Sequence, residues 1–288
     1  MGILSSKPKT KWTAQGRNIL ITGASSGIGE ETARLFAKQG ANLALIARGR
    51  ENLERVADEC RKLGSKNVKV FSADLADAAN VEIGMTAAIE EFKGFDVVLL
   101  NAGQSQGCYF EEIRDPTQIK YMLDLNVNGI MTSLFYLLPS IFKSKHSRIV
   151  VTSSSAGLVG GPFRTIYSAT KFALTGFCNS LRMELDQTYG DDAPSVCLVN
   201  IAEVKGTKLN KGRMKFGAVQ PPAEFDEAIA KPVEKACKEL VEAIVDGERQ
   251  WGEPLLVTLL QILVILFPSV ADFITKRYMK KNMLRNGK

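Results

Sequence analysis

The 288-residue sequence predicts an α/β fold in which one doubly wound parallel sheet carries helices on both faces. Two observations support this class. Short apolar runs alternate along the chain with longer amphipathic stretches, and right-handed crossovers place the helices of such a pattern on both faces of a parallel sheet. The composition, 45% hydrophobic and 24% charged, is ordinary for a globular protein with a sizeable core.

The expected elements follow one another from the N-terminus. Short runs rich in Val, Ile and Leu predict buried strands at 18–22, 42–47, 68–72, 95–100, 148–153 and 195–201. Helical patterns lie between them at about 28–39, 50–63, 79–92, 117–143 and 165–188. The chain has no internal repeat and no low-complexity linker. We therefore expect a single domain over residues 17–253, preceded by a basic N-terminal arm at 1–16.

The segment 254–288 differs in composition from the rest. Its apolar run at 255–267 is interrupted only by Thr258 and Gln261. This run is shorter than the roughly 20 apolar residues that a membrane-spanning helix needs. It is either a buried core helix or a helix that lies in a membrane interface, and the basic, acid-free tail behind it favours the interface. We predict a C-terminal membrane-associating segment.

The net charge of +6 lies mainly at the two ends of the chain. Residues 1–17 carry four basic side chains and residues 276–288 carry six, with no acidic residue in either segment. The remaining chain holds 27 basic against 31 acidic residues. Nucleic-acid enzymes carry their basic charge on the body of the fold. Basic ends on a slightly acidic body favour an anionic membrane surface, with solvated tails that have no partner as the alternative, so no nucleic-acid partner is expected.

The cysteines and the histidine give no sign of a metal centre. The five cysteines are scattered without CxxC spacing, which is typical of reduced thiols rather than of a disulfide framework or a zinc site. His146 is the only histidine. We expect no bound metal and no mechanism that depends on a histidine base.

The first loop, "TGASSGIG" at 22–29, follows a predicted strand and opens a predicted helix. Its glycines, Gly23, Gly27 and Gly29, allow a sharp turn and a close approach of the backbone to a pyrophosphate, which a helix N-terminus favours. Ser25, Ser26 and Ile28 complete the loop. The order of strand, loop and helix predicts a dinucleotide site.

The stretch "TIYSATKFAL" places Tyr167 and Lys171 four residues apart. Residues at this spacing are neighbours on one face of a helix. A nearby ammonium favours the phenolate and lowers a tyrosine pKa from its usual value of about 10. The pair is either two polar residues on one helix face or a proton donor with the cation that tunes it.

Together these motifs resemble the short-chain dehydrogenase/reductase family over residues 17–247. The resemblance implies a Rossmann-type sheet and an active site of Asn126 in "LNVNG", Ser154 in "TSSSAG", Tyr167 and Lys171. By the same resemblance, the tyrosine is the general acid/base and the lysine also holds the nicotinamide ribose. The serine hydrogen-bonds the substrate oxygen, and the asparagine supports a water relay.

NADP(H) is the expected cofactor. Arg48 stands nineteen residues after the last loop glycine, where an acid would bind the ribose 2′-hydroxyl of NAD, and a guanidinium suits a 2′-phosphate instead. The resemblance adds Asp74 of "ADL" at the adenine and "NAG" in the nucleotide cleft. The expected cofactor-binding set is Gly23, Ser25, Ser26, Gly27, Ile28, Gly29, Arg48, Asp74, Leu75, Asn101, Ala102, Gly103, Tyr167, Lys171 and Thr207. Thr207 departs from the family pattern, because "NIAEVKGTKL" lacks the usual Pro-Gly and brings the threonine one residue late.

Several stretches are similar to the 11-beta-hydroxysteroid dehydrogenase and dehydrogenase/reductase member 7 group, namely "LIAR", "LLPSIFK", "YSATKFALTGF" and "LFPSVADFITKRYMKK". This similarity implies a membrane-associated NADP(H)-dependent oxidoreductase for a bulky hydrophobic ketone or alcohol that is steroid- or lipid-like. A 3-ketodihydrosphingosine reductase is the nearest alternative. A non-catalytic nucleotide-binding scaffold is the second alternative.

The expected partners beyond substrate and cofactor are a membrane and a second copy of the chain. The family pairs the helices at 117–143 and 165–188 across a two-fold axis, which implies a homodimer. The start "MGILSS" fits the N-myristoylation pattern with Gly2 as the acceptor, and one acyl chain beside basic residues would anchor the protein. We expect the protein on the cytosolic face of a membrane, that of the endoplasmic reticulum.

Overall fold

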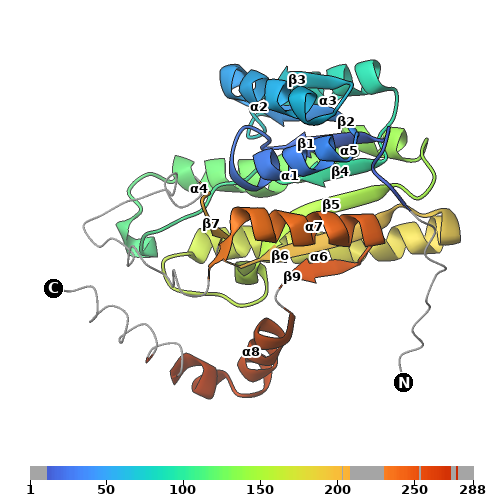
Figure 1. Ribbon diagram of the computed structural model, residues 1–288. Coiled ribbons are helices and arrows are strands. Elements are labelled where there is room, and N and C mark those ends of the chain that lie inside the picture. The colour runs from blue at the N-terminus through green and yellow to red at the C-terminus, as the bar shows by residue number, and fades with distance from the viewer. Residues whose placement is uncertain (1–11, 203, 208–229, 253, 274–276, 278–288) are drawn as a thin grey trace.

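A seven-stranded parallel sheet forms the centre of the molecule, in the order β3-β2-β1-β4-β5-β6-β9 (Figure 1). The computed structural model describes residues 12–202, 204–207, 230–252, 254–273 and 277. The strands are β1 (Asn18–Thr22), β2 (Asn42–Ala47), β3 (Val68–Ser72), β4 (Val97–Leu100), β5 (Arg148–Ser154), β6 (Ser195–Ile201) and β9 (Gln250–Gly252). The strand order reverses between β1 and β4, and α/β proteins bind ligands beyond the carboxyl ends of the strands at such a point.

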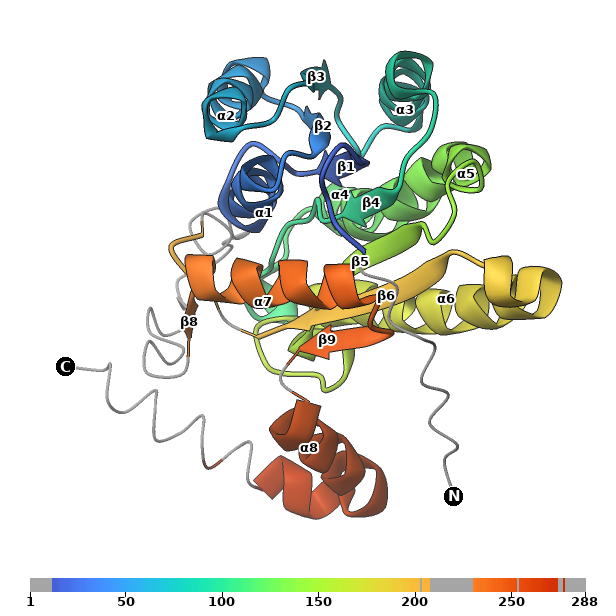
Figure 2. The same cartoon turned by 45° about the vertical axis from the view of Figure 1, so that its right-hand side comes forward.

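Helices cover both faces of the sheet, as predicted (Figure 2). One buried apolar cluster joins the sheet to α1 (Gly27–Lys38), α2 (Arg50–Leu63) and α7 (Val233–Asp246). A second joins it to α3 (Ala78–Phe92), α5 (Gly129–Ile141) and α6 (Thr165–Tyr189). Successive β1 residues alternate between the two clusters, with Ile19 and Ile21 in the first and Leu20 in the second. The doubly wound fold is therefore confirmed.

The third strand is an edge strand and is only partly buried. In β3, Lys69 and Ser72 are exposed, and the Lys69 ammonium lies 2.8 Å from a carboxylate oxygen of Glu91. The prediction of a buried strand at 68–72 is wrong in this respect, because β3 pairs with β2 alone. An edge strand carries charge on its open side, which opposes edge-to-edge pairing with another chain.

The helical pattern at 117–143 divides into three parts. They are α4 (Thr117–Leu123), a π-helical turn η2 (Asp124–Asn128) and α5. A π turn holds one residue more than an α-helical turn and occurs frequently at functional sites. Here it contains Asn126, whose side chain is fully buried.

Among the elements that were not predicted from the sequence are the helix α7 and the strand β9. The helix α7 lies beside α1, and β9 extends the sheet beyond β6 (Figures 1 and 2). A separate pair of two-residue parallel strands joins β7 (Val204–Lys205) to β8 (Lys231–Pro232).

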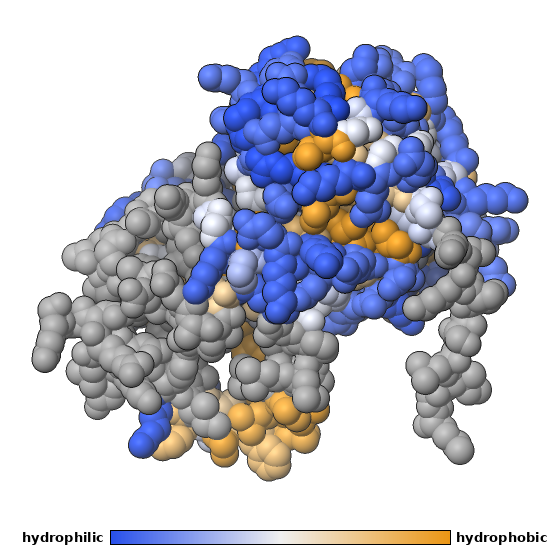
Figure 3. All heavy atoms as spheres, in the orientation of Figure 1, coloured by the Kyte–Doolittle hydropathy of each residue, from blue (hydrophilic) through white to orange (hydrophobic). Residues whose placement is uncertain are grey.

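The C-terminal helix α8 (Pro254–Leu266) lies apart from the main helical layers, beyond β9 (Figures 1 and 2). Large apolar side chains are exposed on it and just after it: Leu259, Ile262, Val264, Ile265, Leu266, Phe267, Val270 and Phe273. They form an apolar surface in Figure 3, which we call the α8 surface. A buried core helix is therefore the wrong alternative for this run. None of the helices in the described residues is long and apolar enough to cross a membrane.

Candidate active site

The glycine-rich loop joins β1 to α1 in a conformation that requires glycine. Gly23 and Gly27 have φ values of 66° and 60°, in the left-handed region that residues with a side chain rarely adopt. A Cβ on Gly29 would overlap the carbonyl oxygen of Gly23. The N-cap residue Ser26 makes no side-chain capping bond with the first turn of α1. The loop therefore presents backbone and a helix N-terminus, the arrangement that binds anions.

Thr22 joins this loop to the segment after β4. Its hydroxyl oxygen accepts hydrogen bonds from the backbone N–H groups of Asn101, at 2.9 Å, and Ala102, at 3.1 Å. The Asn101 side-chain amide donates back to the Thr22 carbonyl oxygen at 3.1 Å. A Cβ on Gly23 would lie only 3.0 Å from the Ala102 Cα. The glycine loop and "NAG" thus form two adjoining walls of one cavity.

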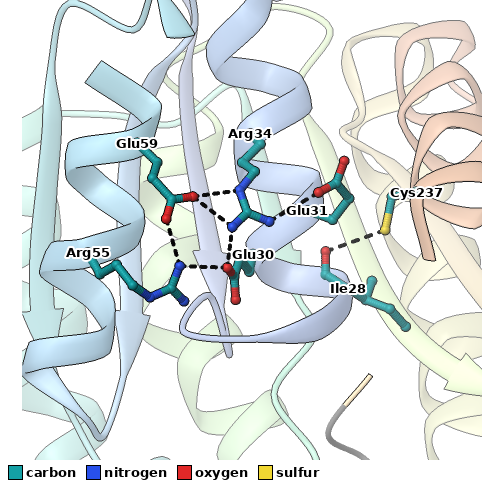
Figure 4. A network of polar contacts seen from close by, with 7 residues as sticks. All are labelled: Ile28, Glu30, Glu31, Arg34, Arg55, Glu59 and Cys237. Carbon is teal, nitrogen blue, oxygen red and sulfur yellow. Dashed lines mark hydrogen bonds and ion pairs between the residues drawn. The ribbon is translucent and has the colours of Figure 1, made fainter. Parts of the chain in front are cut away.

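A network of ion pairs holds α1 against α2 (Figure 4). Arg34 of α1 donates to Glu59 of α2 at 2.8 Å and pairs with Glu30 on its own helix. Arg55 of α2 lies 2.8 Å from both Glu30 and Glu59. On the other side, the Cys237 thiol of α7 lies 3.6 Å from a carbonyl oxygen in the first turn of α1. The helix that begins at the glycine loop is therefore held from both sides.

Arg48 lies at the rim of the cavity, directly after β2. Its guanidinium donates to the Tyr121 hydroxyl oxygen at 2.6 Å and lies 3.9 Å from a carboxylate oxygen of Asp74. The Arg48 side chain is 62% exposed. Burial raises the pKa of the Tyr121 phenol. No motif in the sequence indicates Tyr121, because 73 residues separate it from Arg48.

Tyr167 and Lys171 both line this cavity from the first turns of α6. Both are buried, and the Lys171 Nζ lies 5.6 Å from the centre of the Tyr167 ring. The ammonium donates to the Thr152 carbonyl oxygen at 2.9 Å. Burial lowers the pKa of Lys171 to about 8. The spacing in the sequence thus corresponds to a true side-by-side pair.

Ser154 reaches the same cavity from the end of β5. Its side-chain oxygen accepts a hydrogen bond from the Ala156 N–H at 3.2 Å. The preceding residue, Ser153, donates to the carbonyl oxygen of Lys171 at 3.3 Å. Ser154, which is expected to contact the substrate, and Ser153 therefore have different hydrogen-bond partners.

Asn126 stands behind the cavity wall rather than in it. Its side-chain amide donates to the Gln104 carbonyl oxygen at 2.9 Å and accepts from the Gln104 N–H at 2.8 Å. It also donates to the Thr170 hydroxyl oxygen at 3.2 Å. A Cβ on Gly103 would lie 3.2 Å from the Asn126 Oδ1 and 3.7 Å from the Lys171 Nζ. The asparagine and the lysine therefore both lie close to the position that a Gly103 side chain would occupy.

The cavity has a volume of about 430 Å³, within the range of small-molecule sites. Every residue expected to bind the cofactor lines it except Gly29, whose Cα faces the carbonyl oxygen of Gly23. Ser154 lines it as well. Thr207 also lines it, and its Cβ would lie 3.4 Å from a Cβ on Gly27. Arg164, which no motif indicates, lines it as well. The described residues contain no cluster that could hold a metal ion.

These residues fit a nicotinamide dinucleotide. The backbone of the glycine turn borders the cavity and can approach a pyrophosphate closely, and Arg48 and Asp74, which follow β2 and β3, also line it. Tyr167, Lys171 and Ser154 meet at the end beyond β5. A glycine turn that opens a helix, beside a cavity at the carboxyl ends of parallel strands, suits this cofactor.

Comparisons with known proteins agree with this geometry. A family model described as short chain dehydrogenase matches residues 17–212. The Arabidopsis thaliana protein named 11-beta-hydroxysteroid dehydrogenase-like 3 is 32% identical over 255 residues, which are 88% of this chain and 79% of that protein.

Two solved structures have the same fold. A short chain dehydrogenase/reductase from Burkholderia phymatum in complex with NAD superposes with a TM-score of 0.76 at 23% identity, covering 88% of this chain and 94% of that chain. A short-chain dehydrogenase from Sphingobium yanoikuyae in complex with NADPH gives 0.72 at 24% identity, covering 83% and 88%.

Proposed function

Because the chain belongs to the short-chain dehydrogenase family, we propose that it transfers a hydride between NADP(H) and a bulky hydrophobic ketone or alcohol. It is an oxidoreductase that uses a nicotinamide cofactor. The observation that carries the proposal is the buried Lys171 ammonium beside Tyr167, in a cavity that Ser154 also lines. The choice of NADP(H), the site roles and the substrate class are the proposed parts.

In the proposed mechanism, Tyr167 gives a proton to the carbonyl oxygen of the substrate, and takes it back in the reverse direction. The bound nicotinamide supplies the hydride. An ammonium close to a phenol favours the phenolate over the neutral phenol, and this is the role that we propose for Lys171. Ser154 donates a hydrogen bond to the same substrate oxygen, which stabilises the negative charge that develops there.

Asn126 holds the wall between these groups. Its two bonds to the Gln104 backbone fix the segment that includes Gly103, and a Cβ on Gly103 would lie 3.2 Å from the Asn126 Oδ1 and 3.7 Å from the Lys171 Nζ. We assign Asn126 to the support of a proton path toward Lys171 rather than to contact with the substrate, because it does not line the cavity.

The preference for NADP(H) rests on Arg48. Its guanidinium is mostly exposed at the cavity rim, where a 2′-phosphate could accept a charge-assisted bond from it. The neighbouring Asp74 carboxylate accepts a hydrogen bond from the Ala76 N–H at 3.0 Å. Its other oxygen lies 3.9 Å from the Arg48 guanidinium. The related structures hold NAD in one case and NADPH in another, so the family alone does not set this preference.

Support for a steroid- or lipid-like substrate comes from the relatives and from α8. The Arabidopsis thaliana relative is named after 11-beta-hydroxysteroids. The Gln261 side chain of α8 donates to the Leu158 carbonyl oxygen at 3.4 Å, in the loop that follows Ser154. This bond connects α8 to the loop that begins beside the proposed substrate contact.

The test is oxidation of NADPH by the purified protein with a panel of an 11-ketosteroid, retinal and 3-ketosphinganine. Turnover of the steroid supports the proposal, and turnover of 3-ketosphinganine alone would favour the reductase alternative. Tyr167→Phe is the matched control, because it removes the proton donor and keeps the ring. Binding of NADPH without oxidation of any panel member, in a protein that folds, would favour the non-catalytic scaffold.

We also propose that the α8 surface lies in the interface of a membrane, on its cytosolic face in the endoplasmic reticulum. Exposed Ile265, Leu266 and Phe267 would enter the acyl boundary. The proposal adds Gly2 and the basic residues of the two tails as second anchors, and of these only Arg17 and Arg277 are among the described residues.

Sedimentation with vesicles of phosphatidylcholine and phosphatidylserine tests this placement. Ile265→Asp combined with Phe267→Asp should release the unacylated protein from the vesicles. Ile83→Asp, at an equally exposed isoleucine on α3, is the control and should change nothing. Unchanged sedimentation of the double variant, with Gly2→Ala also present, would contradict the interfacial placement.

A further inference from the structure

The helix that carries the proton donor does not cap its own N-terminus. Arg164 occupies the N-cap position of α6 and makes no side-chain capping bond. The first four N–H groups of a helix have no partner within it, and buried ones need an acceptor from elsewhere. In α6 these groups include the N–H of Tyr167, and both Tyr167 and its neighbour Ile166 are buried.

The Gln106 side chain supplies that acceptor from a distant segment. Its Oε1 accepts from the N–H groups of Ile166, at 2.8 Å, and Tyr167, at 3.3 Å. Its Nε2 donates to the Thr165 hydroxyl oxygen and the Cys108 carbonyl oxygen, each at 3.3 Å. Gln106 is only 1% exposed, so these bonds form without competition from water. Every polar atom of this amide is used.

The chain that leads into α6 is itself held in an unusual conformation. Phe163, two residues before the helix, has a φ of 65°, which is an outlier for a bulky residue. The Cys108 N–H donates to its carbonyl oxygen at 3.3 Å, and its ring packs on Tyr109 with 4.3 Å between ring centres. Such a conformation persists when the surroundings determine it. The segment 106–109 therefore sets how the chain enters the helix.

The same segment continues from the wall of the cavity. Gly103, Gln104 and Ser105 line the cavity, and the backbone of Gln104 holds Asn126. Gln106 follows two residues later and holds the backbone of Tyr167. One short stretch after β4 thus fixes two residues of the proposed active site, which come from η2 and α6.

We propose that Gln106 is a positioning residue that sets the Tyr167 phenol relative to the cavity through the first turn of α6. The inference rests on the proposed function. The side chain does not contact the cavity and takes no part in proton transfer. It fixes the backbone from which the phenol projects, and small displacements of a reacting group slow catalysis strongly.

Gln106→Met is the principal test, because methionine keeps the length and burial of glutamine but has neither the acceptor nor the donors. We expect kcat to fall about 100-fold. We expect KM and the dissociation constant of NADPH to change by less than about threefold, since the Gln106 side chain does not reach the cavity. Hydride transfer should also become more rate-limiting, so the deuterium isotope effect with NADPH labelled at the transferred position should rise. A loss of folded protein alone would leave the isotope effect unchanged.

Two further variants separate positioning from stability. Gln106→Glu keeps an oxygen for the two N–H groups, and we expect a higher kcat than in Gln106→Met. Its pH–rate profile should move to higher pH, because a carboxylate near Tyr167 disfavours the phenolate. Ser65→Ala, the control, removes a buried hydrogen bond to the Ala41 carbonyl oxygen far from α6. It should lower the melting temperature and leave kcat unchanged.

Amide hydrogen exchange tests the same contact without a substrate. In Gln106→Met, the amides of Ile166 and Tyr167 should exchange faster, while those of β5 stay protected. Unchanged exchange at these amides would overturn the inference even if no carbonyl compound is turned over. Unchanged kcat and isotope effect in Gln106→Met, or a Gln106→Glu variant as slow as Gln106→Met at every pH, would also overturn it. A failure of the proposed function would instead appear as an inactive wild type with fast exchange only in the variant.

Discussion

Replacing Lys171 by methionine is expected to stabilise the cofactor-free protein at neutral pH while it removes activity. The side chain is 3% exposed, and burial lowers the pKa of its ammonium from 10.5 to about 8. One pKa unit corresponds to about 1.4 kcal/mol, so this shift destabilises the folded, protonated state by about 3 kcal/mol. Methionine carries no charge and avoids that penalty.

The effect depends on pH with a definite sign. Below pH 8 the folded and unfolded chains both hold the proton on Lys171, and the full penalty is present. Between about 8 and 10.5 the folded protein has released the proton while the unfolded chain still holds it. The free energy of unfolding of the wild type therefore rises, relative to that of the variant, as pH increases through this window.

A lost hydrogen bond reduces the gain. The Lys171 ammonium donates to the Thr152 carbonyl oxygen at 2.9 Å, and methionine cannot. Losing a hydrogen bond with a charged partner costs roughly 1.5–3 kcal/mol. We therefore expect Lys171→Met to be more stable by about 1 kcal/mol at pH 7 and less stable by about 2 kcal/mol above the ordinary lysine pKa.

Urea unfolding of both proteins across this pH range measures the difference directly, because titrations of all other groups cancel. Lys143→Met is the matched control, since Lys143 also donates to a backbone carbonyl oxygen, at 3.1 Å, but is exposed. Its difference from the wild type should be independent of pH. A pH-independent difference for Lys171→Met as well would refute the reasoning, because it would mean that the buried ammonium is not penalised.

Three other outcomes are expected. Arg48→Asp should invert the preference for NADPH over NADH, since the loss of one charge-assisted bond is worth about 10- to 100-fold in affinity; equal use of both cofactors by the wild type would contradict the assignment. Gly29→Ala should weaken cofactor binding and lower the melting temperature, because its Cβ overlaps the Gly23 carbonyl oxygen, whereas Gly176→Ala, in an open helical position, should gain about 0.5–1 kcal/mol. Equal melting temperatures of the two alanine variants would argue against this. The proposed dimer pairs α5 and α6 of two copies, and Phe135→Glu should produce a monomer by light scattering, since Phe135 is 73% exposed on α5; a wild type that is already monomeric would refute the pairing.

The parts of the site that could be predicted from the sequence are local. Tyr167 and Lys171 are neighbours because any helix brings residues four apart together. The glycine turn depends on backbone freedom at Gly23 and Gly27, which a run of eight letters reveals. Both features need only short-range geometry, and the resemblance to a family added the roles.

Contacts between distant segments could not be predicted in this way. Gln106 lies 61 residues from Tyr167, and Asn126 lies 44 residues from Thr170. No periodicity in a single sequence encodes such a pair. The place of Asn126 behind the wall depends in addition on the π turn, which interrupts an otherwise uniform helical pattern.

The helix α7 and the strand β9 were missed for different reasons. The helix α7 has an amphipathic pattern, with Cys237, Leu240, Val241 and Ile244 buried against α1, and this signal was available. By contrast, β9 has only three residues, too few for any period to show. Its place at the sheet edge is set by the carboxyl-terminal turn of α7 and by pairing with β6.

The π turn η2 divides the continuous helical segment of α4, η2 and α5, which we call the helical arm, into two parts whose side chains are rotated relative to each other about the helix axis. Each residue of an α-helix advances by about 100°, so one extra residue rotates everything on one side of the turn by that angle relative to the other. The arm therefore presents α5 to α3 and α4 to α6, two surfaces that a straight helix would leave out of register. Deleting a single residue from Asp124–Asn128 would restore a regular α-helix and remove the rotation between α4 and α5. Such a deletion would turn Asn126 away from Gln104 while leaving the composition of the arm almost unchanged.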